Sequence, residues 1–331
     1  MGVDNLIKKY RNIPPRLLGL ESLLRRCRLN SFDKERAEQE LINRKAGYKG
    51  EKSVDYTLSF LAEKKYSIFH DLRLPHGDHY FQMDTILISK SFILIMEVKN
   101  LAGIIYFDPE FDQMIRELDG KKEGFPNPLT QVKRHKYQVK HWLDRYKLPQ
   151  LPIETLVVFS HPSTIIQASN LSPEQKKQIT HSTNLFSKIG PLERRYIKEI
   201  LETKEIRKLV DSFIKNHTPD LPNLIEQFHI QKNNILKGVH CPKCYSMPMK
   251  RDYGKWICSA CGFSSRQAHL DSLIDYLFLI GPTITNQQLR NFLQIPSRFV
   301  ATDILTSLKV EQHGSTKGRT YQLSSILEKK M

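Results

Sequence analysis

The sequence of 331 residues lacks a long apolar segment, and this excludes several classes of protein. The longest apolar run, Phe92 to Met96, has the length of a strand and is far too short to cross a bilayer as a helix. The N-terminus has no apolar core of the kind found in secretory signal peptides. There is also no internal repeat and no low-complexity tract. We therefore expect a cytoplasmic protein with no membrane partner.

Cysteine is scarce, and its odd count argues against a disulfide framework. Of the five cysteines, four form two CxxC pairs, Cys241 with Cys244 and Cys258 with Cys261, and Cys27 stands alone. This spacing indicates metal thiolates in a reducing compartment. The isolated Cys27 is expected to be a small buried apolar residue.

Acidic residues are too few to balance the basic ones. There are 35 Asp and Glu residues against 51 Lys and Arg, which gives a net charge of +16. Such an excess predicts affinity for polyanions, because each phosphate contact releases condensed counterions. Nucleic acid is the favoured partner. An anionic membrane surface, or a charge that only maintains solubility, is the alternative.

The length and the 40% of apolar residues allow two or three domains. Composition divides the chain into five segments: a basic helical lead-in (1–45), an α/β domain (46–190), a charged helical connector (191–237), a cysteine-containing segment (238–266) and a small C-terminal domain (267–331).

Hydrophobic periodicity in residues 46–190 predicts a mixed α/β layout. The expected order is a helix, three strands, a helix and a further strand, at residues 47–64, 67–74, 81–88, 92–98, 129–146 and 155–160. The third strand is apolar on both faces, so we expect it to be central and buried.

Charged residues at the end of this third strand suggest a divalent-metal site. Glu97 and Lys99 are two residues apart, so both side chains leave the same face of the strand. A short turn at residues 89–91 would pair the strand with the preceding one and bring Asp84 close to Glu97. Two carboxylates in this position would bind a hard cation such as Mg²⁺. The alternative for Glu97 and Lys99 is an ordinary salt bridge at a strand end.

The order of these motifs resembles the nuclease-related domain (NERD) family, which belongs to the PD-(D/E)XK nuclease superfamily. The resemblance covers roughly residues 45–160 and rests on Gly50-Glu51, Gln82-Met83-Asp84 and Glu97-Val98-Lys99-Asn100, followed by Gly103. It implies an α/β fold with a PD-(D/E)XK-type mixed sheet flanked by helices. It also implies hydrolysis of phosphodiester bonds with Mg²⁺ or Mn²⁺.

The resemblance further implies a role for each residue of the site. Glu51, Asp84 and Glu97 would hold the metal ion, which activates a water and neutralises charge on the scissile phosphate. Lys99 would orient the water or stabilise the transition state. Gln131, at the start of the next helix, would complete the catalytic set near the metal-bound water.

The helix expected at residues 129–146 is basic. Lys133 and Arg134 follow Gln131 and are predicted to contact the phosphate backbone of the substrate. The alternative is a solvated basic face of an ordinary helix.

The paired cysteines predict a structural zinc site. Cys241, Cys244, Cys258 and Cys261 supply four thiolates, which close a tetrahedral Zn²⁺ site and leave no open position. The metal would contribute folding energy and take no part in catalysis.

The segment around these cysteines resembles a topoisomerase-type zinc ribbon, which binds nucleic acid. Its hairpin strands are expected at residues 249–253 and 255–258, with Gly254 at the bend. Lys255 and Trp256 would supply a phosphate contact and a stacking surface for bases. A ribbon that merely joins two domains is the alternative.

Residues 267–331 resemble a small winged-helix domain. Three helices are expected at residues 270–280, 285–292 and 297–308, with Thr285 and Ser297 as N-caps, followed by a hairpin at residues 310–323. In this interpretation Arg298 lies on the recognition helix, and Lys317 and Arg319 lie in the wing. A protein-interaction module of the same fold is the alternative.

These interpretations combine into a Mg²⁺-dependent deoxyribonuclease with a zinc ribbon and a winged helix as accessory DNA-binding modules. The alternative is a non-catalytic DNA-binding or regulatory protein built on a nuclease-like scaffold, and RNA is a further candidate partner. The intact set of acids favours the nuclease, because a scaffold has no reason to keep unpaired carboxylates beside a buried strand.

Overall fold

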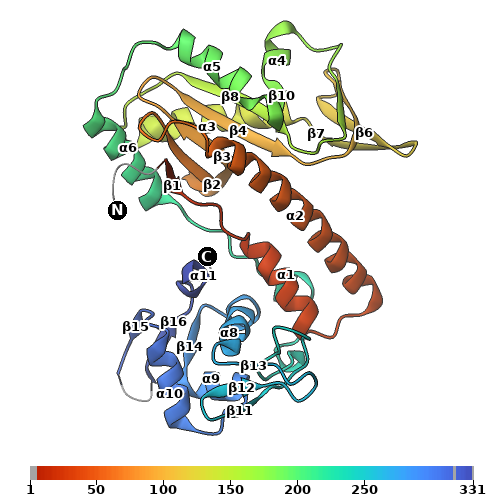
Figure 1. The fold of residues 1–331 in the computed structure, drawn as a ribbon, viewed down its shortest axis with the longest axis vertical. Helices are drawn as coiled ribbons and strands as arrows, with labels where there is room; N and C mark the ends of the chain where they lie inside the picture. Colours follow the sequence, from red (N-terminus) through yellow and green to blue (C-terminus); the bar gives the residue numbers. More distant parts are fainter. Residues whose placement is uncertain (1–5, 316–317, 330–331) are drawn as a thin grey trace. The chain divides into compact units, whose positions relative to one another are not determined.

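The computed structural model describes residues 6–315 and 318–329, and the chain separates into two compact units (Figure 1). Unit 1 contains Met1–Arg11 and Lys45–Pro219, and unit 2 contains Asn12–Arg44 and Asp220–Met331. This division splits two of the segments expected from composition: the lead-in after Arg11 and the helical connector after Pro219.

Unit 1 is built on a six-stranded mixed sheet with the strand order β1-β2-β3-β4-β8-β10. Strands β2, β3 and β4 pair antiparallel, whereas β1, β8 and β10 pair parallel to their neighbours. The strand bounds are Ile7–Lys9 (β1), Ser67–His76 (β2), His79–Ile88 (β3), Ile93–Lys99 (β4), Ile153–Phe159 (β8) and Ile179–His181 (β10). The mixed α/β fold predicted from the sequence is confirmed.

Strand β4 lies between β3 and β8, in the centre of this sheet, as its continuous apolar run predicts. Its side chains alternate between two hydrophobic cores: Ile93 and Ile95 face one core, and Leu94 and Met96 face the other. The first core also contains residues of α3 (Pro128–Arg145) and α6 (Thr203–Asn216). The second contains residues of α2 (Ser31–Leu58) and α5 (Leu185–Arg195). The sheet is therefore covered by helices on both faces.

Two features of the fold differ from the sequence expectation. Helix α2 begins at Ser31 and ends at Leu58, because its middle turns are polar and exposed and carry no apolar stripe that would reveal a helix. The structure also has a second sheet, separate from the six-stranded one, with the strand order β7-β6-β5-β9. Its strands were missed because they are short and bury few apolar side chains; their bounds are Gly103–Asp108 (β5), Gln113–Leu118 (β6), Lys121–Pro126 (β7) and Thr164–Gln167 (β9).

Unit 2 contains α1 (Pro15–Arg26), a three-stranded ribbon sheet and a C-terminal group of helices and strands around one core. The ribbon has the order β11-β12-β13, and its first two strands, Lys250–Asp252 and Lys255–Ile257, form the expected hairpin; β13 is Ser264–Ser265. The C-terminal elements are α8 (Ala268–Leu279), β14 (Thr283–Thr285), α9 (Asn286–Leu293), α10 (Arg298–Ser307), β15 (Gln312–His313), β16 (Thr320–Gln322) and α11 (Ile326–Lys329).

The two N-caps expected in this C-terminal group are confirmed. The Thr285 side chain accepts a hydrogen bond from the Gln288 amide, and the Ser297 side chain accepts one from the Val300 amide. Among the described residues no helix combines the length and the apolar character needed to span a membrane.

Candidate active site and zinc centre

The candidate active site begins where two central strands separate. The β3–β4 ladder ends at the pair Thr85–Met96, whereas β4 continues beside β8 as far as Lys99. Asp84 and Glu97 are the next residues beyond the end of this ladder. The Asp84 carboxylate crosses the gap, because its Oδ2 accepts a hydrogen bond of 2.8 Å from the amide of Val98. Asp84 is thereby fixed beside the Glu97 strand, as the hairpin argument predicts.

Lys99 connects Glu97 with the first turn of α3. Its Nζ donates to Glu97 Oε1 over 2.7 Å and to Gln131 Oε1 over 3.2 Å. Glu97 is 4% exposed, and its second oxygen, Oε2, is buried without a hydrogen-bond partner among the described residues. A buried carboxylate oxygen without a partner is costly, and such oxygens commonly accept a metal ion or an ordered water. The donor set therefore fits a hard divalent cation.

Glu51 reaches the site because the preceding glycine lets α2 approach the sheet closely. A Cβ atom at Gly50 would lie 2.4 Å from the Cβ of Asn100 and 2.5 Å from the Oγ of Ser160, so any other residue would push the helix away. The Glu51 Oε2 atom accepts a hydrogen bond of 2.7 Å from Arg11 Nη1.

The three acids share one pattern of attachment. A protein group holds one oxygen of each carboxylate: Arg11 for Glu51, the Val98 amide for Asp84, and Lys99 for Glu97. The carboxylates lie wider apart than the ligands of a formed metal site. Among the described residues, only the four ribbon cysteines form a group of three or more ligand atoms within 4.8 Å of one another.

Burial and mutual repulsion disfavour the charged form of these acids. Burial raises the pKa of Glu51 to about 9 and that of Glu97 to about 7, and the charge of Asp84 contributes to both shifts. Burial also raises the pKa of Asp84. Carboxyl groups with such perturbed pKa values are typical of ion-binding and catalytic sites.

Acids outnumber cations in the wider site. Among the described residues five carboxylates face four cations, so full ionisation leaves a net negative charge that a divalent cation would offset. The acids are Glu51, Asp55, Asp71, Asp84 and Glu97, and the cations are Lys9, Arg11, Lys52 and Lys99.

Arg11 is the member of this site that sequence analysis missed. Its side chain is 2% exposed and forms ion pairs of 2.7 Å with Glu51, Asp55 and Asp71. These partners lie 40 or more residues away in the sequence, so no local sequence pattern predicts the ion pairs. A charged residue such as Arg11, in a short basic N-terminal segment, is expected to be exposed, so the sequence gave no indication that its side chain is buried.

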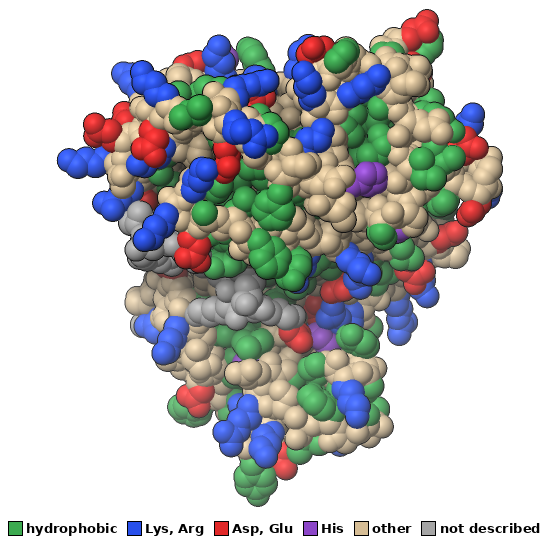
Figure 2. Space-filling view, turned by 45° about the horizontal axis from the view of Figure 1, so that its top comes forward, with side chains coloured by type: hydrophobic (Ala, Val, Ile, Leu, Met, Phe, Trp, Pro, Cys, Tyr) green, Lys and Arg blue, Asp and Glu red, His purple; other side chains and the backbone are tan. Residues whose placement is uncertain are grey.

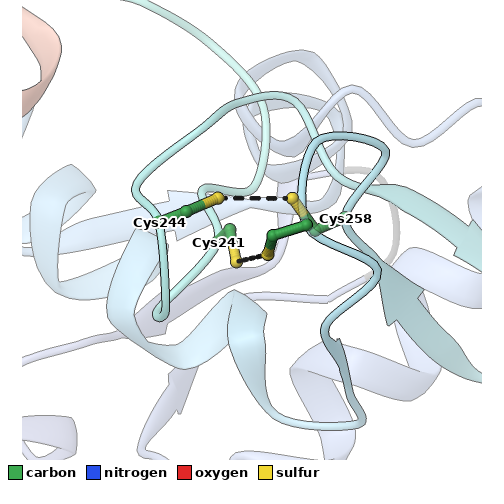
Figure 3. Close-up of side chains that lie close together, drawn as sticks. Cys241, Cys244 and Cys258 are labelled. Carbon is green, nitrogen blue, oxygen red and sulfur yellow. Dashed lines mark hydrogen bonds between the residues drawn. The ribbon is translucent and has the colours of Figure 1, made fainter.

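The four ribbon cysteines converge as their spacing predicts. Cys241 and Cys261 have their sulfur atoms 3.7 Å apart, and the sulfur atoms of Cys244 and Cys258 are 3.6 Å apart (Figure 3). All four sulfur atoms lie within 4.8 Å of one another. This arrangement is compatible with a closed tetrahedral site for structural Zn²⁺, which is consistent with a zinc ribbon.

The two cysteine pairs are held by matching backbone turns. The amide of Tyr245 donates to the carbonyl of Cys241, and the amide of Gly262 donates to the carbonyl of Cys258. Both donors have a left-handed backbone, with φ values of 59° and 69°. Each turn therefore presents its thiolates in the same way, which is typical of zinc knuckles.

The basic residues expected at nucleic acid are exposed wherever the structure describes them. Lys133 and Arg134 lie on α3, Lys255 and Arg298 lie in unit 2, and Arg319 precedes β16. Lys317 lies outside the described residues. Figure 2 shows Lys and Arg side chains spread over the visible face, interleaved with Asp and Glu and not gathered into one patch.

The prediction that Trp256 stacks on bases is wrong. Trp256 is 1% exposed, and its Nε1 donates to the buried His269. Neighbouring residues of a strand point to opposite faces, so an exposed Lys255 requires Trp256 to face the core.

Comparison with known proteins identifies the part of the chain that carries the acids. Residues 46–160 match the family model of the nuclease-related domain. An uncharacterized protein of Bacillus anthracis is 29% identical over 132 residues, which is 39% of this chain, and the chain spans 59% of the length of that relative. No solved structure matches the chain. Residues 46–160 therefore carry a nuclease-related domain, and this domain implies a nuclease-like fold for that part of the mixed α/β structure.

Proposed function

We propose that the protein is a deoxyribonuclease that depends on Mg²⁺ or Mn²⁺, with Glu51, Asp84 and Glu97 as the metal ligands. The observation that carries the proposal is the buried Glu97 oxygen, which has no hydrogen-bond partner in the part of the chain that the structure describes, beside Asp84 and the Lys99–Gln131 pair. When bound, the metal ion would supply an activated water and a positive charge at the scissile phosphate.

The other residues of the site have distinct roles in this proposal. Lys99 stabilises negative charge on the phosphate, and its contacts with Glu97 and Gln131 hold the ammonium group in place before the substrate arrives. Gln131 also has an amide nitrogen, which can donate to a water or to a phosphate oxygen. Lys133 and Arg134, exposed on the same helix, bind the DNA backbone without regard to sequence.

Unit 2 supplies accessory nucleic-acid-binding modules in this proposal. The element order α8, β14, α9, α10, β15, β16 is the order typical of winged-helix domains, which supports α10 as a recognition helix with Arg298 exposed at its start. Arg319 would contact DNA from the wing. Structural Zn²⁺ on free thiolates requires a reducing compartment, which agrees with a cytoplasmic protein.

One observation favours the second candidate, a non-catalytic DNA-binding or regulatory protein. Glu51 forms an ion pair with Arg11, so part of the negative charge of the acid set is already neutralised inside the protein. In this candidate the same fold binds DNA without cutting it. RNA is the alternative substrate for either candidate.

A cleavage assay separates the two candidates. Supercoiled plasmid and single-stranded DNA are incubated with Mg²⁺, with Mn²⁺ or with a chelator, and a single-stranded RNA tests the alternative substrate. We expect metal-dependent cleavage that Asp84→Ala reduces by about 100-fold or more. Asp78→Ala is the matched control, because Asp78 is an exposed acid on the β2–β3 turn. Cleavage by Asp84→Ala at the wild-type rate would exclude the proposed nuclease site. DNA binding without cleavage by the wild type would favour the second candidate.

A further inference from the structure

A single guanidinium group, that of Arg11, occupies the space between α2 and β2. Arg11 Nε and Nη2 form a fork onto the two oxygens of Asp55, at 2.7 and 3.1 Å. Arg11 Nη1 donates to Glu51 Oε2 and to Asp71 Oδ1, at 2.7 Å each. Asp55 and Glu51 lie on one face of α2, since they are four residues apart. Arg11 therefore fixes the orientation of this face of the helix.

The same guanidinium also holds the strand that carries Asp84. Arg11 Nη2 donates to the backbone carbonyl of Asp84 over 2.8 Å and to Thr85 Oγ1 over 3.0 Å. The carbonyl is accessible to it because the β2–β3 ladder pairs His70 with Thr85 and Leu72 with Met83, without a pair between Asp71 and Asp84. Asp71 has a left-handed backbone, with φ of 51°, at this interruption.

We propose that Arg11 is a positioning residue of the metal site, which sets the distance between the Glu51 carboxylate on α2 and Asp84 on β3. This inference rests on the proposed function, since it assumes that both acids bind the metal. It also extends the site beyond the nuclease-related domain at residues 46–160, because Arg11 belongs to the segment that follows β1.

The alternative role for Arg11 is a mere counter-charge for the surrounding acids, and its geometry argues against this. A planar guanidinium offers five donors in a rigid fork, and here the contacts use Nε, Nη1 and Nη2. Lys9 shows the contrast. It is a second cation of the same segment, but its Nζ donates to the carbonyl of His70 over 2.7 Å. A counter-charge role would not require Arg11 to form hydrogen bonds with both α2, which carries Glu51, and β3, which carries Asp84.

The two roles predict opposite results for metal affinity, which can be measured without any cleavage. The zinc-loaded full-length protein is titrated with Mn²⁺, and binding is followed by calorimetry or by the spectrum of free Mn²⁺. Arg11→Lys keeps the charge and loses the fork, and Arg11→Met loses both. Positioning predicts that both variants bind Mn²⁺ about 10- to 100-fold more weakly, the usual effect of losing a group that orients a metal ligand. Arg195→Met, the matched control, removes an arginine of the same unit that pairs with Glu154 and should bind as tightly as the wild type.

A counter-charge would give tighter binding in Arg11→Met, because an opposing cation is gone, and unchanged binding in Arg11→Lys; either result overturns the inference. Thr85→Val decides the matter if the Arg11 variants fail to fold. It removes one acceptor of Arg11 without changing any charge. A positioning role therefore predicts weaker Mn²⁺ binding, whereas a counter-charge role predicts Mn²⁺ binding equal to that of the wild type. A wild-type protein that binds no Mn²⁺ refutes the proposed metal site itself, which is a distinct outcome from unchanged binding in the variants.

Discussion

Single carboxyl groups determine how the proposed metal site responds to pH. The folded protein raises the pKa of Glu97 to about 7 and that of Glu51 to about 9, whereas both would titrate near 4.5 in an unfolded chain. Below this ordinary value both carboxyl groups are protonated in the folded and in the unfolded protein. Above it the unfolded chain loses protons that the folded chain still holds. These two groups therefore stabilise the fold at low pH, and their contribution is lost as the pH rises through the folded pKa values.

We predict that the melting temperature of the protein without Mg²⁺ or Mn²⁺ at this site falls as the pH is raised from about 5.5 to about 9. Glu97→Gln should flatten this decline, because its amide does not titrate. Mn²⁺ needs the deprotonated acids, so its stabilising effect should grow over the same range. Differential scanning calorimetry with the ribbon zinc in place measures both trends. A decline of the same slope in Glu97→Gln would show that Glu97 does not control it.

At the scale of elements, the ribbon hairpin presents a different aromatic from the one its sequence suggests. Strands β11 and β12 are closed by the pair Asp252–Lys255, which leaves Tyr253 and Gly254 as a two-residue turn with positive φ at both positions. Such a turn matches the twist of the strands. Tyr253 is 97% exposed at this tip, and the exposed Lys250 and Lys255 flank it.

We predict that Tyr253 is the stacking residue of the ribbon. Tyr253→Ala should weaken binding to single-stranded DNA by about 1–3 kcal/mol, and Tyr253→Phe should restore it, since the ring alone stacks on a base. Fluorescence anisotropy with a labelled oligothymidine at fixed salt measures the change. Equal affinity of Tyr253→Ala and the wild type would leave the ribbon as a structural connection. Phe32 on α2, which is 71% exposed, offers a matched aromatic-to-alanine control in the same unit.

The sequence predicted the elements whose signal is local. Strand β4 is recognisable because both of its faces are apolar, and the zinc cluster because its ligands come in two close pairs. The sheet of β5 to β7 escaped detection, because its strands are only six residues long and bury few side chains, Ile105, Phe107 and Met114, between exposed or half-buried ones. Arg11 escaped it because buried ion pairs arise from tertiary contacts that no periodicity encodes.

At the scale of the whole molecule, each unit has its own hydrophobic core. One core contains Cys241, Cys258 and Trp256 of the ribbon together with residues of α1, α8, α9 and α10, all of which belong to unit 2. The other three cores contain only residues of unit 1. Metal ions at the two proposed sites should therefore stabilise different units, because a ligand stabilises only the cooperative unit that binds it.

We predict two thermal transitions that respond to different metals. Removal of zinc, or the double substitution Cys258→Ser with Cys261→Ser, should lower the transition of unit 2, since structural zinc contributes folding energy directly. It should leave the transition of unit 1 in place, where the acids that would bind Mn²⁺ lie. Mn²⁺ should raise the unit 1 transition, and Asp84→Ala should abolish this shift without affecting unit 2. Calorimetry of the four combinations, with and without each metal, tests the prediction. A single transition that moves with either metal would show that the two units unfold together, and then the ribbon zinc would support the nuclease-related domain as well.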